Sequence, residues 1–185
     1  MTHLPIVAVI GSGVDEHLKF TEPVGCWLAT QQVHLLTGGG GGVMTAVSRA
    51  FAGTPGRHGL VIGILPSESG TGKAPSGYPN QWVEIPIATH LPYSGERGTD
   101  VLSRNHINVL TADIVIVLPG RAGTSSEAHL AVRYNKPIAA FVASVDNPTL
   151  VSRRCCSYYP RWIDVARDYI VTQSSQLSSC ITPRS

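Results

Sequence analysis

The chain has 185 residues, which is the length of one domain because domains commonly hold about 100–200 residues. A formal net charge of +2 provides no strongly basic surface, so nucleic acid is not an expected partner. No apolar stretch reaches the roughly 18 residues of a membrane span, and no signal-peptide pattern opens the sequence, so we expect a cytoplasmic protein without membrane contact.

The first half of the sequence predicts strands that alternate with helices. The apolar, β-branched run 6–10 is typical of a strand buried on both faces of a parallel sheet, and the runs 33–36 and 60–65 have the same character. Apolar side chains recur at helical spacing over 20–31 and 43–51. This alternation favours a parallel sheet with helical crossovers.

The second half continues the alternation after a long loop. Residues 66–80 are rich in glycine, proline, serine and threonine, and a loop of this length favours function or mobility over mere connection. Pro86 removes a hydrogen-bond donor, so the strand over 82–88 is expected at a sheet edge. The remaining predicted elements are strands over 113–118 and 138–143 and helices over 98–110, 124–134 and 162–170.

Together these elements predict an α/β fold: one doubly wound domain with a mostly parallel sheet of about six to seven strands flanked by helices. We assign residues 1–170 to this ligand-binding domain and residues 171–185 to a polar tail that we expect to be mobile. The four cysteines and seven histidines lack the spacing of a metal site, so no metal site is predicted, and the neighbouring Cys155 and Cys156 are interpreted as incidental.

Three glycine clusters follow predicted strands: Gly11-Ser12-Gly13, Gly38 to Gly42, and Gly120 to Gly123. The carboxyl ends of parallel strands meet at one edge of a sheet, where ligands bind. Glycine lets backbone N–H groups approach an anion, and a following helix adds its free N-terminal amides. The clusters therefore predict a phosphate-binding crevice, although each cluster is also explained as a tight strand-to-helix turn.

The spacing of these clusters matches neither standard nucleotide motif. Gly38 to Gly42 lacks the Gly-Lys-Ser/Thr ending of a P-loop, and the first cluster lacks the last glycine of GxGxxG. Glu127 has two interpretations. It can complete a capping box begun by Thr124 or Ser125. Alternatively, its carboxylate lies beside the anion, where it holds a ribose hydroxyl or assists a leaving group. Ser12 is equally compatible with a turn former and a phosphate ligand.

Two of these segments resemble the motifs of a known family. Gly38 to Met44 resembles the GGGxxGxM element, and Pro119 to Glu127 the PGGxGTxxE element, of the LONELY GUY (LOG) and lysine-decarboxylase-like proteins, a resemblance that covers residues 5 to 143. It implies a Rossmann-like fold, a homodimer or homotetramer, and a site for a nucleoside monophosphate such as AMP. In the hydrolase branch, an Arg-Lys pair and the motif glutamate cleave the N-glycosidic bond of a cytokinin 5′-monophosphate.

The chain departs from the hydrolase branch at two positions. Arg104 and Glu127 match the family residues, but Asn105 stands where the family has lysine, and Arg121 replaces the second motif glycine. Residues 103–110 instead resemble the Arg-x-x-Ile-Asn pattern of the molybdenum cofactor carrier proteins. That resemblance implies a protein that binds the phosphorylated pterin of the molybdenum cofactor and delivers it to molybdoenzymes. The alternatives are a nucleoside 5′-monophosphate phosphoribohydrolase with Arg104 and Glu127 as catalytic residues, and a nucleotide-sensing module.

Individual side chains have alternative interpretations. Arg104 can clamp a phosphate or form a surface or interface salt bridge. Asn105 and Asn108 can bind the ligand, cap the helix or face a subunit interface. His106 is expected near the cleft. The full set of residues that we expect to contact the ligand is Gly11, Ser12, Gly13, Gly38, Gly39, Gly40, Gly41, Gly42, Met44, Arg104, Asn105, Asn108, Pro119, Gly120, Gly123, Thr124, Ser125 and Glu127.

Overall fold

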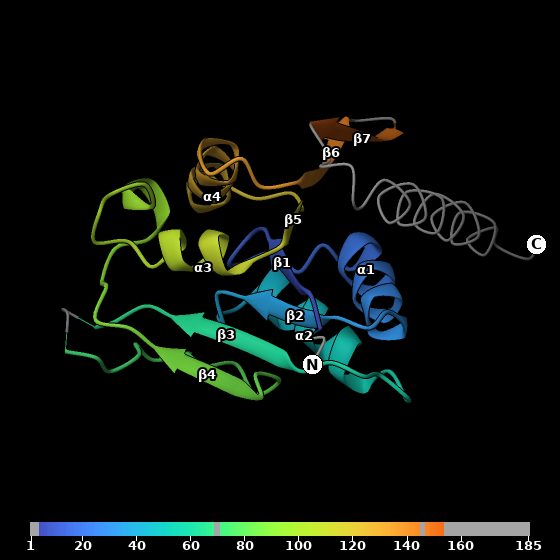
Figure 1. Cartoon of the computed structure of the whole chain (residues 1–185), viewed down its shortest axis with the longest axis horizontal. Helices are drawn as coiled ribbons and strands as arrows, with labels where there is room; N and C mark the ends of the chain where they lie inside the picture. Colours follow the sequence, from blue (N-terminus) through green and yellow to red (C-terminus); the bar gives the residue numbers. More distant parts are fainter. Residues whose placement is uncertain (1–3, 69–70, 145–146, 154–185) are drawn as a thin grey trace, which may run out of the picture.

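The computed structural model describes residues 4–68, 71–144 and 147–153 (Figure 1). Its sheet has seven strands in the order β4-β3-β2-β1-β5-β6-β7. All neighbours are parallel except β6 and β7, which are antiparallel. The strands are β1 (Ile6–Ile10), β2 (His34–Thr37), β3 (Val61–Leu65), β4 (Ile85–Ala88), β5 (Ile114–Val117), β6 (Ile138–Ser144) and β7 (Asn147–Arg153).

Helices cover both faces of this sheet. The α-helices are α1 (Leu18–Thr30), α2 (Val43–Gly53), α3 (Asn105–Thr111) and α4 (Ala122–Arg133), and a short 3-10 helix, η1 (Gly95–Arg97), precedes α3. Figure 1 shows α1 and α2 on one side of the sheet and α3 and α4 on the other. This three-layer arrangement confirms the predicted doubly wound α/β fold.

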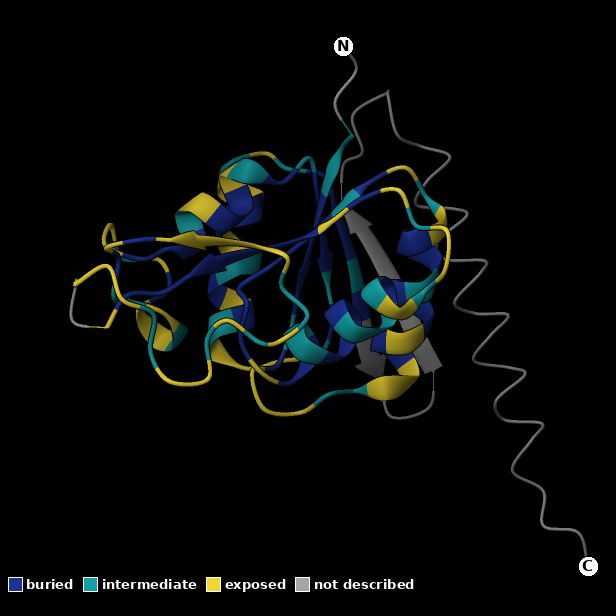
Figure 2. Cartoon of the chain, turned by 90° about the horizontal axis from the view of Figure 1, so that it is seen from below, coloured by how far each residue is buried: buried dark blue, intermediate teal, exposed yellow. Residues whose placement is uncertain are grey.

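Two apolar cores fill the spaces between the layers. Alternate side chains of β1 point to opposite faces, so Val7 and Val9 pack with α1 and α2, whereas Ala8 and Ile10 pack with α3 and α4. Phe51 of α2 is fully buried in the first core. Strands β1, β2, β3 and β5 form the buried centre in Figure 2, while exposed residues gather on the edge strand β4, on outer helix faces and on loops.

The strand order places a topological switch at β1. After β1 the chain crosses to β2 through α1, whereas β5 returns to the other side of β1, with Ile10 opposite Val117. Loops that leave the carboxyl ends of β1 and β5 therefore diverge to opposite faces, and a crevice opens between them.

Three elements differ from the sequence prediction. Strand β7 was not predicted. Strand β4 lies at the sheet edge as predicted, but begins only at Ile85. The helix predicted over 98–110 is wrong in its first half, because Asp100 Oδ1 accepts the Leu102 N–H and Ser103 Oγ accepts the Asn105 N–H. These side-chain bonds form local turns that compete with a helix, so α3 begins at Asn105.

The predictions for the C-terminal segment lie outside the described residues: the helix over 162–170, the tail over 171–185, and the cysteine pair. Within the part of the chain that the structure describes, no helix has the length and apolar character needed to cross a bilayer.

Candidate functional site

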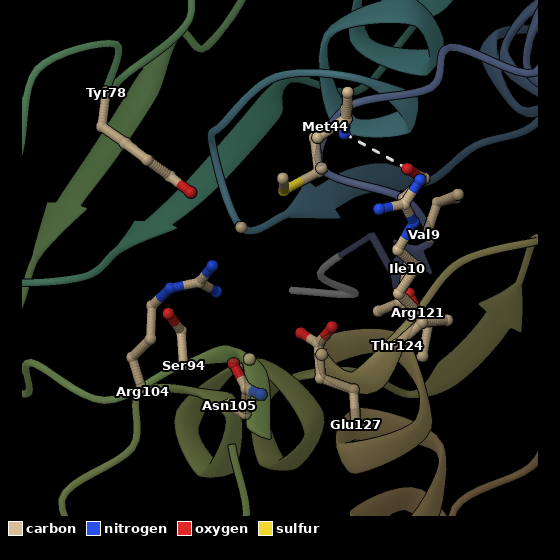
Figure 3. A pocket seen from close by; sticks show the side chains of 17 residues that line it. Val9, Ile10, Met44, Tyr78, Ser94, Arg104, Asn105, Arg121, Thr124 and Glu127 are labelled. Carbon is tan, nitrogen blue, oxygen red and sulfur yellow. Dashed lines mark hydrogen bonds between the residues drawn. The ribbon is translucent and has the colours of Figure 1, made fainter. Parts of the chain in front are cut away.

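A pocket of about 260 Å³ lies at the carboxyl ends of the central strands, where the switch-point crevice is expected (Figure 3). The turn after β1, the start of α2, the loops before and after η1, and the first residues of α3 and α4 all contribute to its walls. Predicted residues that line it are Gly11, Ser12, Gly13, Gly38, Met44, Arg104, Asn105, Gly123, Thr124 and Glu127.

The other predicted residues lie outside this lining: Gly39, Gly40, Gly41, Gly42, Asn108, Pro119, Gly120 and Ser125. Gly39, Gly40, Gly42 and Asn108 are buried. Pro119 and Gly120 instead contact the turn after β1. The Pro119 carbonyl accepts the Ser12 N–H at 3.0 Å, and Gly120 lies so close to this turn that a Cβ there would be 2.8 Å from Ser12 N. The turn after β5 therefore supports the turn after β1.

Arg104 is the buried cation of the pocket. Its side chain is only 5% exposed, and its Nε and Nη1 atoms have no hydrogen-bond partner among the described residues. The guanidinium lies against the backbone of Gly38, where a Cβ would be 2.6 Å from Nη1. Arg104 forms none of the ion pairs found in the described part of the chain, so the surface salt-bridge interpretation is wrong within one subunit. A buried unpaired cation favours an anion beside it.

Glu127 lies in the pocket next to this cation. Figure 3 shows its carboxylate and the Arg104 guanidinium both directed into the pocket. Asn108 Nδ2 donates to Glu127 Oε1 at 2.8 Å, so Asn108 orients the glutamate from behind. Burial raises the pKa of Glu127 above its ordinary value, and the opposing effects of Arg104 and of the Asn108 hydrogen bond do not cancel this shift.

The first turn of α4 presents backbone amides to the pocket. The helix begins at Ala122, and its first helical hydrogen bond runs from Ser125 N to Arg121 O. The amides of Ala122, Gly123 and Thr124 have no backbone acceptor among the described residues, so they are available to an anion. No side chain caps this helix, so the predicted capping box of Thr124 or Ser125 with Glu127 is wrong, and Glu127 is free to face the pocket.

The turn after β1 lines the pocket without a helix directly behind it. Ser12 Oγ accepts the N–H groups of Val14 at 3.2 Å and Asp15 at 2.9 Å, so Ser12 is a turn former in this structure. Helix α1 begins only at Leu18. The expected contribution of a following helix N-terminus therefore does not apply to Gly11 and Gly13, and at α2 the first amide, Val43 N, already donates to the Ser12 carbonyl at 2.8 Å.

Sequence reasoning missed several lining residues: Val9, Ile10, Val14, Tyr78, Ser94, Gly95 and Arg121. Arg121 was detectable as the departure from the family motif, and Tyr78 as the aromatic residue of the 66–80 loop. Ser94 and Gly95 had no such signal, because they lie in a segment that the sequence analysis interpreted only as a connection. His106 does not line the pocket, because its ring bridges the Tyr134 hydroxyl and the Asp100 carbonyl.

A metal site is not formed by the described residues, since they contain no group of three His, Cys, Asp or Glu side chains able to hold an ion. The pocket instead combines a buried guanidinium, helix amides and one carboxyl group. Such a set of groups is suited to an anionic organic ligand, with one titratable group beside it.

Comparisons with known proteins agree with this site. The model of the SLOG cluster4 family matches residues 4–155. A protein of unassigned function from Archaeoglobus fulgidus is 31% identical over 136 residues, which cover 72% of this chain and 78% of that protein.

Solved structures with the same fold include a molybdenum cofactor binding protein and a molybdenum cofactor carrier protein. The molybdenum cofactor binding protein of Rippkaea orientalis is 26% identical, with a TM-score of 0.63, and the match covers 98% of this chain and 100% of that one. The molybdenum cofactor carrier protein of Chlamydomonas reinhardtii is 28% identical, with a TM-score of 0.57 over 74% and 75% of the two chains. The chain therefore belongs to the SLOG cluster4 family, a LOG-like Rossmann family near the molybdenum cofactor carrier branch.

Proposed function

We propose that this protein binds the molybdenum cofactor, a phosphorylated pterin, and carries it in the cytoplasm to molybdoenzymes. The observation that supports this proposal most is the Arg104 guanidinium: the residue lines the pocket, and two of its buried nitrogen atoms have no hydrogen-bond partner among the described residues. Similarity to two proteins that bind this cofactor supports the choice of ligand.

The residues present fit such a ligand. Arg104 and the free amides of Gly123 and Thr124 offer donors to phosphate and other anionic oxygens. Asn105 is 2% exposed and lines the pocket, where its amide can hydrogen-bond a pterin edge without taking up a proton. The cofactor brings its own metal, which is consistent with a pocket lining that holds anions by hydrogen bonds.

A second candidate function is hydrolysis of a nucleoside 5′-monophosphate. Glu127 favours it, because a half-buried glutamate with a raised pKa is suited to general acid catalysis beside Arg104. Asn105 disfavours it, since the second cation of the family's Arg-Lys pair is missing. Carriage without bond cleavage needs the cations of the pocket and no proton transfer, so it is the function that we favour.

The decisive experiment compares two arginine variants. Arg104→Gln removes the buried charge of the pocket, whereas Arg133→Gln removes an exposed charge in the last turn of α4. We expect the wild-type protein to bind the cofactor saturably and to slow its oxidation, and we expect Arg104→Gln to weaken binding about 10- to 100-fold because charged hydrogen bonds are lost. Arg133→Gln should bind like the wild type.

Two results would contradict this proposal. The first is no saturable binding of the cofactor by the wild-type protein. The second is release of free base from AMP or a cytokinin monophosphate that disappears in Glu127→Gln, which would establish the hydrolase. Saturable nucleotide binding without turnover, together with no cofactor binding, would instead favour a nucleotide-sensing module.

The family resemblance implies a homo-oligomer, and we further propose that in it a second copy of the chain covers part of α3. Ile107 and Leu110 lie three residues apart on α3 and are 36% and 51% exposed. Leu102, in the turn before this helix, is 43% exposed. Leu110→Glu is expected to convert the homo-oligomer to monomers in analytical ultracentrifugation, because it places a charge in an apolar contact. A monomeric wild-type protein would contradict the proposal.

A further inference from the structure

Tyr78 occupies a position in the pocket that anion binding does not explain. It is the aromatic side chain among the residues that line the pocket. Figure 3 shows it reaching into the pocket from the side opposite Glu127, with its hydroxyl leading. None of the described residues hydrogen-bonds this hydroxyl, although the residue is half-buried. A tyrosine directed into a cavity with a free hydroxyl is suited to contact a ligand.

The glycine turn after β2 fixes the loop that carries Tyr78. Asn80 N donates to the Gly39 carbonyl at 2.8 Å, and Asn80 Nδ2 donates to the Gly40 carbonyl at 2.9 Å. The hydroxyl end of the Tyr78 ring rests directly on Gly40, where a Cβ would lie 2.7 Å from both Cζ and Oη. The missing Cβ of Gly40 therefore leaves room for the tyrosine ring, which already has this position in the structure without a ligand.

The pocket is chemically divided. Arg104 and the amides at the start of α4 supply its anion-binding part. Val14, Met44 and Tyr78 also line the pocket, and Val14 is 77% exposed, so apolar surface remains there that a phosphate group cannot use. Such surface is suited to the planar, weakly polar body of a larger ligand.

We propose that Tyr78 recognises the heterocyclic ring of the ligand, contacting it with its own ring and hydrogen-bonding a ring heteroatom through its hydroxyl. This inference rests on the proposed function and adds the residue that distinguishes a ring-bearing phosphate from a simple anion. In this arrangement Gly40 is a positioning residue, because it sets the place of the tyrosine and does not itself line the pocket.

The test measures three ligands against four variants by calorimetry. Molybdopterin and AMP each carry a ring and a phosphate, whereas inorganic phosphate carries no ring. Tyr78→Ala is expected to weaken molybdopterin binding about 10- to 100-fold, the range for lost ring stacking. Tyr78→Phe should weaken it about 3- to 10-fold through loss of one hydrogen bond. Neither variant should change phosphate affinity more than about twofold, because Arg104 and the α4 amides remain.

Glycine variants separate ring placement from ring presence. Gly40→Ala keeps the tyrosine but displaces its hydroxyl end. We therefore expect this variant to weaken molybdopterin binding about 10-fold and to leave phosphate binding unchanged. Gly53→Ala at the end of α2 makes the same substitution where nothing lies within 4 Å, and it should bind both ligands like the wild type.

The outcomes distinguish this inference from the proposed function. Molybdopterin binding that is unaffected by Tyr78→Ala, or equal weakening of both ligands, would overturn the role of Tyr78 and leave the carrier proposal in place. If AMP binds in a Tyr78-dependent manner and molybdopterin does not bind, the carrier proposal fails while the ring-recognition role is supported. If neither ring-bearing ligand binds, both fail.

Discussion

The two glycine-rich turns that flank the pocket, Gly38 to Gly42 and Gly120 to Gly123, differ in what approaches their backbones. Protein groups occupy most of the first turn: the Arg104 guanidinium at Gly38, the Tyr78 ring at Gly40, and the backbone of the turn after β1 at Gly42. In the second turn, Gly120 packs against Ser12, whereas Gly123 faces the pocket at a free helix end. A glycine cluster therefore marks close approach to the backbone, and the approaching group is often protein.

The largest expected effect comes from the most crowded position of the first turn. Gly42 has φ +59, and a Cβ there would collide with the Ser12 carbonyl and lie 2.6 Å from Val14 N. Both neighbours are backbone atoms that cannot rotate away. We expect Gly42→Ala to lower the free energy of unfolding by at least about 3 kcal/mol, measured by urea denaturation, since strain of about 1–3 kcal/mol adds to the clash.

Gly56 is the matched control for this variant. It has φ +76 but nothing lies within 4 Å of its Cβ position, so Gly56→Ala isolates backbone strain from collision. We expect a loss of about 1 kcal/mol there, the lower end of the cost of a left-handed alanine. Equal losses at the two positions would show that the contact between Gly42 and the turn after β1 does not stabilise the fold.

The second expected effect concerns ligand binding through Gly38. A Cβ at this position would lie 2.6 Å from Arg104 Nη1, so Gly38→Ala should displace the guanidinium while the arginine is retained. Because displacing a binding group by about 1 Å is costly, we expect cofactor affinity to fall about 10-fold or more, measured by calorimetry. Wild-type affinity in this variant would show that the position of Arg104 in the free protein is not the one that binds.

The strands and two site residues could be predicted from the sequence. The apolar runs predicted strands β1, β2, β3, β5 and β6 within a residue or two, because burial on both faces of a parallel sheet leaves a strong local signal. Arg104 and Glu127, more than 20 residues apart in the sequence, were placed in one site by the family motifs.

Other features had no local signal. The partner of each glycine depends on the tertiary fold: Gly40 is fitted to a tyrosine almost 40 residues later, and nothing in the glycine run indicates it. The helix over 98–110 failed because Asp100 and Ser103 side chains satisfy backbone amides that a helix would need. The capping box failed because α4 begins at Ala122, before Thr124.

A smaller effect is expected from the carboxyl group between the turns. The folded-state pKa of Glu127 is raised by burial, so the folded protein binds this proton more tightly than the unfolded chain does. Its favourable contribution is therefore complete below the ordinary pKa of 4.5 and is lost as the pH rises through the folded-state value. The difference in unfolding free energy, wild type minus Glu127→Gln, should fall steadily from about pH 4 towards neutral pH.

This difference isolates Glu127, because all other titratable groups are shared by the two proteins and glutamine can still accept the Asn108 hydrogen bond. Urea denaturation at several pH values measures it. A difference that is constant with pH, or that grows as the pH rises, would mean that the ionised carboxylate is the form the folded protein favours.

The smallest effect is expected at Gly123, in the turn that faces the pocket. A Cβ there would lie 3.5 Å from Gly95 Cα, an ordinary contact, and the residue sits in the first turn of α4. Alanine lowers the cost of ordering a helix, so Gly123→Ala should raise the unfolding free energy by up to about 1 kcal/mol. The amide at 123 is retained, so cofactor affinity should change no more than about threefold. A large loss of affinity without loss of stability would show that the ligand needs the space over Gly123 itself. A ligand would then approach this glycine, whereas protein groups lie against Gly38, Gly40 and Gly42 of the first turn.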